Sequence, residues 1–249
     1  MSDRIIVLAT TEAKLVFRNK TVAVSSVVLP VVLGIFWLFS FSDGDQRRWG
    51  SIIALQLAVV LAMSVYVTAT QTVVARRHHR VLKRLRTSGI SDTGLLVATV
   101  APGVAVGLIQ LLIFTVINVS AGAPLPADPL PLALALLGGL ALSVTAALAT
   151  SVVTPSPERA QITTLPLTFV LLGGAIALSI VPLEGWWQTL VAVPGASIGQ
   201  LSLFAFAGGT WADGLGGLPA LLPAVAALLI WPVVFGTLAR RRFRWDQRN

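Results

Sequence analysis

The chain has 249 residues, of which 55% are hydrophobic and only 11% are charged, and its mean hydropathy is +0.85. Soluble globular proteins carry about 25% charged residues, so the composition excludes an ordinary soluble domain and predicts an integral membrane protein. The formal net charge is +8 and there is no cysteine. Disulfides, thiolate metal sites and cysteine nucleophiles are therefore excluded.

The first twenty residues predict an amphipathic helix at the membrane interface. Projected at about 100° per residue, apolar side chains gather on one side and cations on the other, which are available to anionic headgroups. The apolar side holds Ile5, Ile6, Ala9, Ala13, Val16 and Phe17, and the cationic side holds Arg4, Lys14 and Arg18. A plain basic flank before the first span is the alternative interpretation. The scattered charges argue against a removable signal peptide.

Charge-free apolar runs of membrane-spanning length follow along the chain. A helix needs about 20 such residues to cross the hydrocarbon layer. We predict six spans, at residues 21–42, 50–75, 93–119, 130–153, 161–181 and 218–239. The proline-broken stretch "AGAPLPADP" after the third span is expected to be a loop.

The distribution of Lys and Arg predicts which segments face the cytoplasm, because basic residues near span ends stay on that side. With the N-terminus inside, the inner segments hold sixteen cations: four before the first span, six in the basic segment 76–90, Arg159, and five in the tail 240–249. The outer segments hold only Arg47 and Arg48. Both termini are therefore expected to be cytoplasmic.

Residues 182–217 are apolar but are not counted as a span. If they crossed the membrane, the arginine-rich tail 240–249 would lie outside and break the charge bias. Proline and glycine also interrupt the run, at Pro194, Gly195 and Gly199. We interpret this region as an outer, re-entrant hairpin shielded by the other helices. The predicted fold class is an all-α integral membrane protein with one transmembrane domain over residues 1–249.

The segment "RRHHRVLKRLRTSGISD" between the second and third spans predicts a short cytoplasmic helix over residues 76–90. Its wheel shows a narrow apolar stripe and a cationic back. Gly89 is expected to end this helix, and Ser91 or Asp92 to cap the next span. The stripe holds His78, Val81, Leu82 and Leu85, and the back holds Arg76, Arg77, Arg80, Lys83 and Arg84.

Two interpretations of this basic helix stay open: an anchor on anionic lipid and a docking element whose apolar stripe enters a partner's groove. Nucleic-acid binding is disfavoured because interleaved aromatic residues and a soluble fold are lacking. A metal site is also disfavoured, because the adjacent His78 and His79 point about 100° apart on a helix and no ligand set completes them.

The spans contain few polar groups and no mid-span Asp, Glu, Lys or Arg. Ion-driven carriers usually keep ionisable groups there, so a secondary carrier is disfavoured. Gln56 and Gln110 are candidates for a translocation path, although interhelical hydrogen bonding is their commoner role. Trp186 and Trp187 are candidates for an outer gate, with an aromatic interface belt as the alternative. No catalytic constellation is visible.

The topology and one motif resemble permease subunits of the ABC type-2 exporter family. Such subunits have an N-terminal interfacial helix, six spans, a cytoplasmic coupling helix between spans two and three, and an outer re-entrant hairpin before span six. Drug-exporting members often carry an Arg-Glu pair, a Gly, then Leu-Lys-Arg-Leu-Arg and a proline turn. This chain has "RVLKRLRTSGIS" there, with "RRHH" in place of the Arg-Glu pair and "TSG" in place of the proline turn.

The resemblance implies export of a drug, antibiotic, peptide or lipid across the bacterial plasma membrane by alternating access. A second permease copy or paralogue would enclose the path, and a separate subunit would bind ATP and Mg²⁺, since this sequence has no GxxxxGK[ST] loop. The docking residues it implies are His78, Val81, Leu82, Lys83, Arg84, Leu85 and Arg86. The alternative function is a membrane scaffold or sensor whose basic helix binds anionic lipid; a membrane-embedded enzyme ranks third.

Overall fold

The computed structural model describes residues 28, 31–32, 34–36, 39, 45–79, 81, 91–180 and 185–243. The predicted interfacial helix 1–20, most of the basic segment 76–90 and the end of the tail lie outside the described residues. The described positions between 28 and 39 are helical. Gly34 among them packs so closely on the ring of Phe114 that a Cβ atom would overlap that ring.

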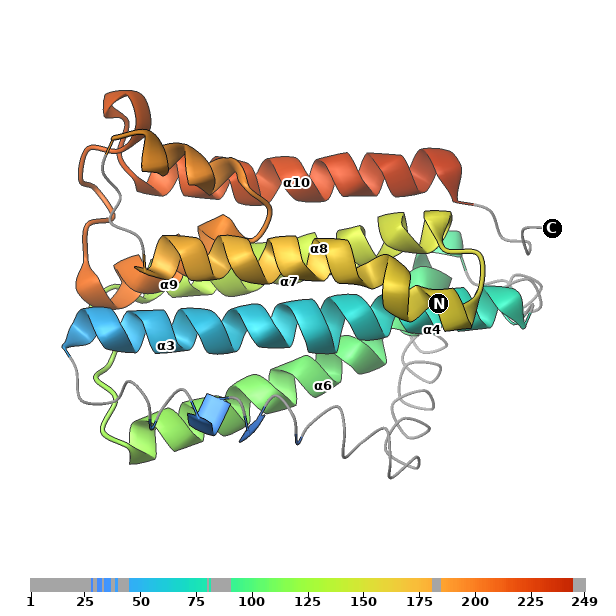
Figure 1. Ribbon diagram of the computed structural model, residues 1–249, viewed down its shortest axis with the longest axis horizontal. Coiled ribbons are helices and arrows are strands. Elements are labelled where there is room, and N and C mark those ends of the chain that lie inside the picture. The colour runs from blue at the N-terminus through green and yellow to red at the C-terminus, as the bar shows by residue number, and fades with distance from the viewer. Residues whose placement is uncertain are drawn as a thin grey trace.

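A continuous helix of 33 residues runs from Gln46 to His78. It consists of α3 (Gln46–Val59), the π-helical segment η1 (Val60–Val67) and α4 (Thr68–His78). Asp45 begins it as an N-cap, because its carboxylate accepts a hydrogen bond from the backbone N–H of Arg48 at 3.2 Å. In Figure 1 this helix extends through the middle of the molecule. Within its most apolar stretch of 18 residues, 78% of the residues are buried.

Four further long helices complete the bundle: α6 (Asp92–Ser120), α7 (Pro129–Val153), α8 (Pro157–Ile180) and α10 (Leu221–Arg242). As predicted, Ser91 caps α6, with its hydroxyl accepting from the N–H of Gly94 at 3.2 Å. Asp128 caps α7 through the N–H of Leu130 at 3.0 Å. The predicted loop after the third span occupies the stretch between α6 and α7.

Among the described residues, five helices are long and apolar enough to cross a membrane, or six if one bent pair counts as a span. The predicted spans 50–75, 93–119 and 130–153 each lie within one of these helices. The fold class predicted from the sequence, an all-helical membrane protein, is therefore confirmed.

The bent pair is the predicted re-entrant region. The 3₁₀ helix η2 (Gly185–Ala192) and helix α9 (Ala196–Ala207) meet at 113°. The indole N–H of Trp231, halfway along α10, donates to the carbonyl oxygen of Ala192 at 2.8 Å, so the bend lies at about the middle of the bundle. Helix α9 then returns to the end where α7 begins, because the N–H of Asp128 donates to the carbonyl oxygen of Ala205 at 3.1 Å. The hairpin thus enters and leaves at one end.

Helix α9 is the centre of the fold, since residues 196–206 are all buried. It packs between α3, α7, α8 and α10. Gly195, with φ of +88°, makes the bend that a residue with a side chain would strain. Irregular backbone at membrane depth is tolerated only where protein shields it, and the four surrounding helices supply that shield.

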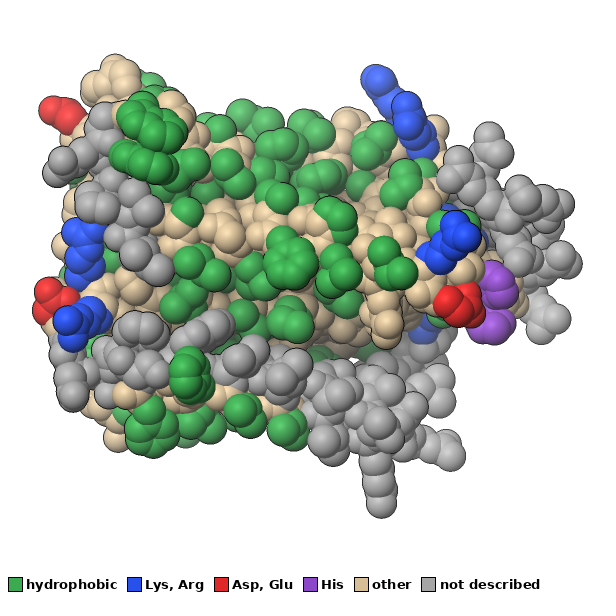
Figure 2. Space-filling model, viewed as in Figure 1, with side chains coloured by type: hydrophobic (Ala, Val, Ile, Leu, Met, Phe, Trp, Pro, Cys, Tyr) green, Lys and Arg blue, Asp and Glu red, His purple; other side chains and the backbone are tan. Residues whose placement is uncertain are grey.

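The described charges divide between the two ends of the bundle (Figure 2). The basic end, where α4, α7 and α10 stop and α6 and α8 start, has six arginines and two acids. The acidic end, where α3, α7 and α10 start, has two arginines and three acids. The basic end holds Arg76, Arg77, Arg159, Arg240, Arg241, Arg242, Asp92 and Glu158; the acidic end holds Arg47, Arg48, Asp45, Asp128 and Asp213.

Candidate functional site

The predicted basic segment begins as a rigid extension of a membrane-spanning helix. Arg77, in the last turn of α4, is only 4% exposed. Its guanidinium donates to the backbone carbonyl oxygen of Thr154, the C-cap residue of α7. A helix C-terminus has unpaired carbonyl groups and a partial negative charge, and a buried cation satisfies both. Arg77 therefore ties the start of the basic segment to the end of α7.

Arg76 makes a similar contact with α6, the next long helix along the chain. Its guanidinium donates to the hydroxyl of Thr99 in α6 at 3.2 Å. The prediction that Arg76 and Arg77 lie on the cationic side of a helix that begins at residue 76 is thus wrong. Because α4 continues the long helix to His78, these two side chains face its neighbours α6 and α7 instead.

The predicted docking residues are described only at their first members. His78 is half-buried at the end of α4, and its ring meets that of His79 edge-on at 5.4 Å between centroids. The carboxylate of Glu158, at the start of α8, lies close enough to interact with both rings. Val81 is helical and half-buried. The predicted docking residues Leu82, Lys83, Arg84, Leu85 and Arg86 lie outside the described residues.

The described part of the chain has no group of three or more His, Cys, Asp or Glu side chains that could hold a metal ion. His78, His79 and the neighbouring Glu158 do not form such a group. Their position instead puts one carboxylate from the first turn of α8 near the start of the basic segment.

Gln56 is bonded to a partner that sequence reasoning did not assign. Its amide N–H donates to Asn118 Oδ1 at 3.2 Å, and Asn118 Nδ2 donates back to Gln56 Oε1 at 2.7 Å. Both side chains are buried, so the two amides satisfy each other between α3 and α6. Gln110 is also buried, in α6. Neither glutamine is exposed on the surface of the single chain.

Trp186 and Trp187 lie apart from these glutamines, on η2 near the acidic end. Their rings stack with centroids 4.0 Å apart, and they are 66% and 41% exposed. Exposed tryptophans at the end of a membrane bundle are typical of the headgroup level. The structure therefore does not bring the four predicted path residues together within one chain.

The π-helical turn in the middle of the second span is a feature that the sequence did not predict. Tyr66 lies within η1 and is fully buried, with its hydroxyl 3.0 Å from that of Thr150 in α7. The hydroxyl of Ser64 is buried without a hydrogen-bond partner among the described residues. Wide helical turns of this kind frequently occur at functional sites. The single Tyr of the chain was the only available signal.

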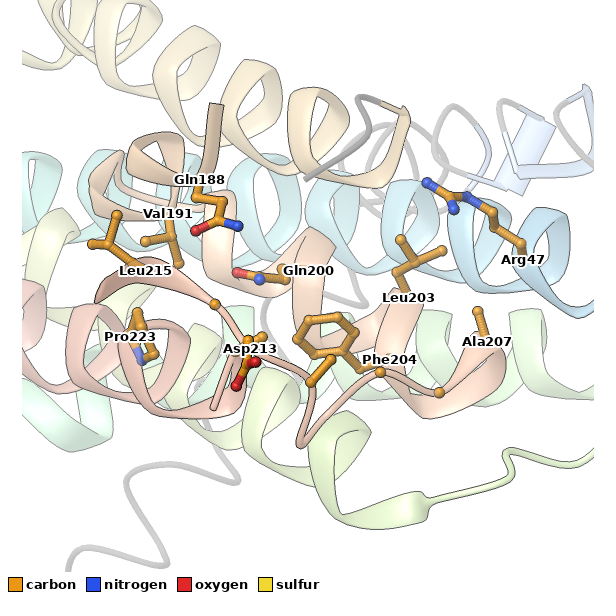
Figure 3. Close-up of a pocket in the computed structure, with 15 residues that line it drawn as sticks. Arg47, Gln188, Val191, Gln200, Leu203, Phe204, Ala207, Asp213, Leu215 and Pro223 are labelled. Carbon is orange, nitrogen blue, oxygen red and sulfur yellow. The ribbon is translucent and has the colours of Figure 1, made fainter. Parts of the chain in front are cut away.

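A cavity of about 260 Å³ lies at the acidic end, between the re-entrant hairpin and the loop before α10. We call it the hairpin pocket (Figure 3). Gln200 of α9 points into it and is 5% exposed, and its Oε1 atom has no hydrogen-bond partner in the described part of the chain. The other labelled lining residues are Arg47, Gln188, Val191, Leu203, Phe204, Ala207, Asp213, Leu215 and Pro223.

Comparison with known families identifies the fold. A family model described as ABC-2 family transporter protein matches residues 43–241, a range that includes all the long described helices except for the last residue of α10. The chain belongs to this family. No curated protein matches the chain closely.

As an ABC-2 family member, the chain is a multi-pass membrane protein and a permease subunit of an ABC transporter. Membership implies an ATP-binding partner subunit. Within that framework, the contact of Arg77 with Thr154 lies where the second span leads into the basic segment. The contact joins the end of α4 to the C-terminus of α7.

Proposed function

We propose that this protein is the permease of a bacterial exporter that moves a hydrophobic or amphipathic substrate out of the cell by alternating access. The substrate would be a drug, an antibiotic, a peptide or a lipid. The observation that carries the proposal is the family match over residues 43–241 together with a described bundle in which charged side chains stay at the two ends. An apolar bundle without ionisable groups at mid-depth suits a substrate that is itself apolar.

The basic end is the cytoplasmic end in this proposal. Six of the described arginines lie there, against two at the other end, which follows the preference of basic residues for the cytoplasmic side. The bacterial plasma membrane is the corresponding location, with both termini inside. The hairpin of η2 and α9 then opens toward the outside.

ATP and Mg²⁺ bind in a separate subunit that docks on the basic segment 76–90. The sequence of this segment has an apolar stripe, Val81, Leu82 and Leu85, among cations, which suits a groove in a partner. Nucleotide shifts the conformational equilibrium only if the two states contact this stripe differently. A second copy or a paralogue of the permease encloses the path, which Gln56, Gln110, Trp186 and Trp187 are predicted to line.

The docking step is tested by the double substitution Leu82→Asp and Leu85→Asp in the full-length protein. We expect the variant to insert normally into the membrane but to lose co-purification with the ATP-binding subunit. The matched control is Thr87→Asp, which introduces a carboxylate in the same segment but, at about 100° per residue, on the helix face opposite the stripe. Stoichiometric co-purification of the double variant would refute docking through the stripe.

Charge reversal at Arg80, Lys83 and Arg84 separates this function from that of a lipid-binding scaffold. A docking helix driven by its apolar stripe should keep its partner after reversal. If the protein is instead a scaffold that only binds anionic lipid, reversal should weaken the binding of this segment to anionic vesicles. The expected loss of binding free energy is about 1 kcal/mol per cation. Vesicle flotation of the peptide and co-purification of the protein measure the two effects separately.

A further inference from the structure

The hairpin pocket contains a buried acceptor that requires a donor. Gln200 is 5% exposed and its Oε1 atom has no hydrogen-bond partner among the described residues. A buried polar atom left in this state costs about 1–3 kcal/mol, so such atoms usually mark a bound water or ligand. In Figure 3 the amide of Gln200 points toward that of Gln188, into the space between η2 and α9. A ligand here needs an N–H or O–H group.

Two opposite charges also line the hairpin pocket. Asp213 comes from the loop before α10, and Arg47 comes from the first turn of α3. Neither side chain is bonded to another described residue. The guanidinium of Arg47 extends toward the pocket in Figure 3. A carboxylate and a guanidinium that have no partner among the described residues and line one cavity favour a ligand that carries both a cation and an anion.

The loop that carries Asp213 is held in a fixed shape. The N–H of Gly214 donates to the carbonyl oxygen of Leu218 at 2.7 Å, and the N–H of Ala220 donates to that of Ala212 at 2.9 Å. The carboxylate is therefore presented from a closed loop rather than from a loose one. A preformed site loses less entropy when it binds its ligand.

The position and size of the cavity narrow the ligand further. The stacked Trp186 and Trp187 lie on η2, the element that also supplies Gln188. Exposed tryptophans lie at the headgroup level of a bilayer. The volume of about 260 Å³ holds roughly nine waters at about 30 Å³ each, which also accommodates a polar headgroup of about eight non-hydrogen atoms.

We propose that the hairpin pocket binds a zwitterionic group with a primary ammonium and a phosphate, of the phosphoethanolamine type. The ammonium donates to Gln200 Oε1 and pairs with the carboxylate of Asp213. The phosphate pairs with the guanidinium of Arg47, and the ring of Phe204 lies beside the group. The site is formed by the single permease chain. Whether it binds this group does not depend on docking to an ATP-binding subunit.

The wild-type protein provides the first test, in nanodiscs with equal amounts of phosphatidylethanolamine and phosphatidylcholine. The two headgroups have the same charges, but the trimethylammonium of choline has no N–H to donate to Gln200. Native mass spectrometry of the released protein should show about tenfold preferential retention of phosphatidylethanolamine, the expected worth of one charge-assisted hydrogen bond. Equal retention of the two lipids overturns the proposal.

Two variants then assign the preference to the hairpin pocket. Gln200→Leu replaces the amide by an apolar side chain of similar size, and Asp213→Asn removes the charge. Each should abolish the preference for phosphatidylethanolamine. The matched control is Asp128→Asn, the same change at the same end but outside the pocket, where Asn can still cap α7. A preference that survives both pocket variants, or that is lost in the control as well, refutes the assignment.

A competition arm separates the two sources of this chemistry. Soluble O-phosphoethanolamine is added at increasing concentration to the wild-type protein with retained phosphatidylethanolamine. Displacement of the lipid shows that the site accepts the free zwitterion and hence the polar end of an amphipathic substrate. Retention of the lipid assigns the site to the membrane headgroup.

Discussion

Gln56 and Asn118 bond to each other twice, with amide N···O distances of 3.2 and 2.7 Å across the interface of α3 and α6. The residues are 62 positions apart, and both are buried. Each side-chain amide therefore donates one hydrogen bond to the other and accepts one from it. The pair fixes the register of the second and third spans, because a shift of one helix by a turn would break both bonds.

This pair should show a measurable coupling energy. The variants Gln56→Leu and Asn118→Leu, alone and together, form a double-mutant cycle. Interhelical hydrogen bonds in membranes contribute about 0.6 kcal/mol on average and up to about 1.7, so we expect a coupling energy of about 1 kcal/mol in reversible unfolding in mixed micelles. Strictly additive losses would show that the two amides stabilise the protein independently.

The contact of Arg77 with Thr154 predicts a loss of stability when the cation is removed. A hydrogen bond to a charged group is worth about 1.5–3 kcal/mol, so Arg77→Met should lower the free energy of unfolding by about that amount. The control is Arg76→Met, which removes the hydrogen bond to the hydroxyl of Thr99. Because Arg76 is less buried than Arg77, this variant should lose less free energy of unfolding. Equal losses in both variants would contradict the special role of the α7 C-terminus.

The close contact of α9 with α8 predicts strong intolerance to one methyl group. A Cβ atom at Gly199 would overlap the carbonyl oxygen of Ala175, so Gly199→Ala must push the two helices apart. Overpacking of this kind costs about 1–3 kcal/mol. Thermal unfolding in detergent measures the loss.

The control for that substitution is Gly173→Ala, in the neighbouring helix α8. A Cβ atom there meets nothing within 4 Å, and Ala is favoured over Gly inside a helix by about 0.5–1 kcal/mol. The melting temperature should therefore stay unchanged or rise. A fall at Gly173 as large as that at Gly199 would mean that α8 is sensitive to any added methyl group.

Removal of the buried hydroxyl of Tyr66 should lower the free energy of unfolding by less than removal of the Arg77 guanidinium. Tyr66→Phe removes the bond to Thr150 but keeps the ring, and a neutral hydrogen bond contributes about 0.5–1.5 kcal/mol. Thr150→Val should have a similar effect, and the double variant should cost little more than either one. Additive losses would show that each hydroxyl has other partners of equal importance.

Charge and hydropathy predicted the parts of this fold that depend on the membrane itself. The arginine-rich tail that follows residue 239 argued against a crossing by residues 182–217, and η2 and α9 do meet at a bend of 113° beside Trp231. Ser91 and Asp92 were both predicted as candidate caps, because short polar side chains directly before an apolar run favour that position, and the structure shows that Ser91 is the cap. These features follow from the local sequence and from the lipid or water that surrounds each segment.

The features that sequence reasoning missed depend on segments far apart in the chain. Arg77 looks like one more solvated cation until the end of α7 is placed beside it. For Gln56 the sequence offered either a place in the translocation path or an interhelical hydrogen bond, and only the packing of the helices identifies Asn118 as its partner. Gln200 stands in an apolar run with no sign that its carbonyl oxygen lines a cavity. Nothing in the local pattern specifies such partners, because packing of whole helices decides them.

The burial of α9 has a consequence for the order in which the protein is assembled. Residues 196–206 of α9 are buried by neighbours that include α10, yet the ribosome completes α9 before α10. A bent, glycine-rich segment has no stable place in lipid by itself. The hairpin must therefore wait near the translocon or the membrane surface until the last helix arrives, and a chain truncated before Leu221 should be degraded rather than inserted.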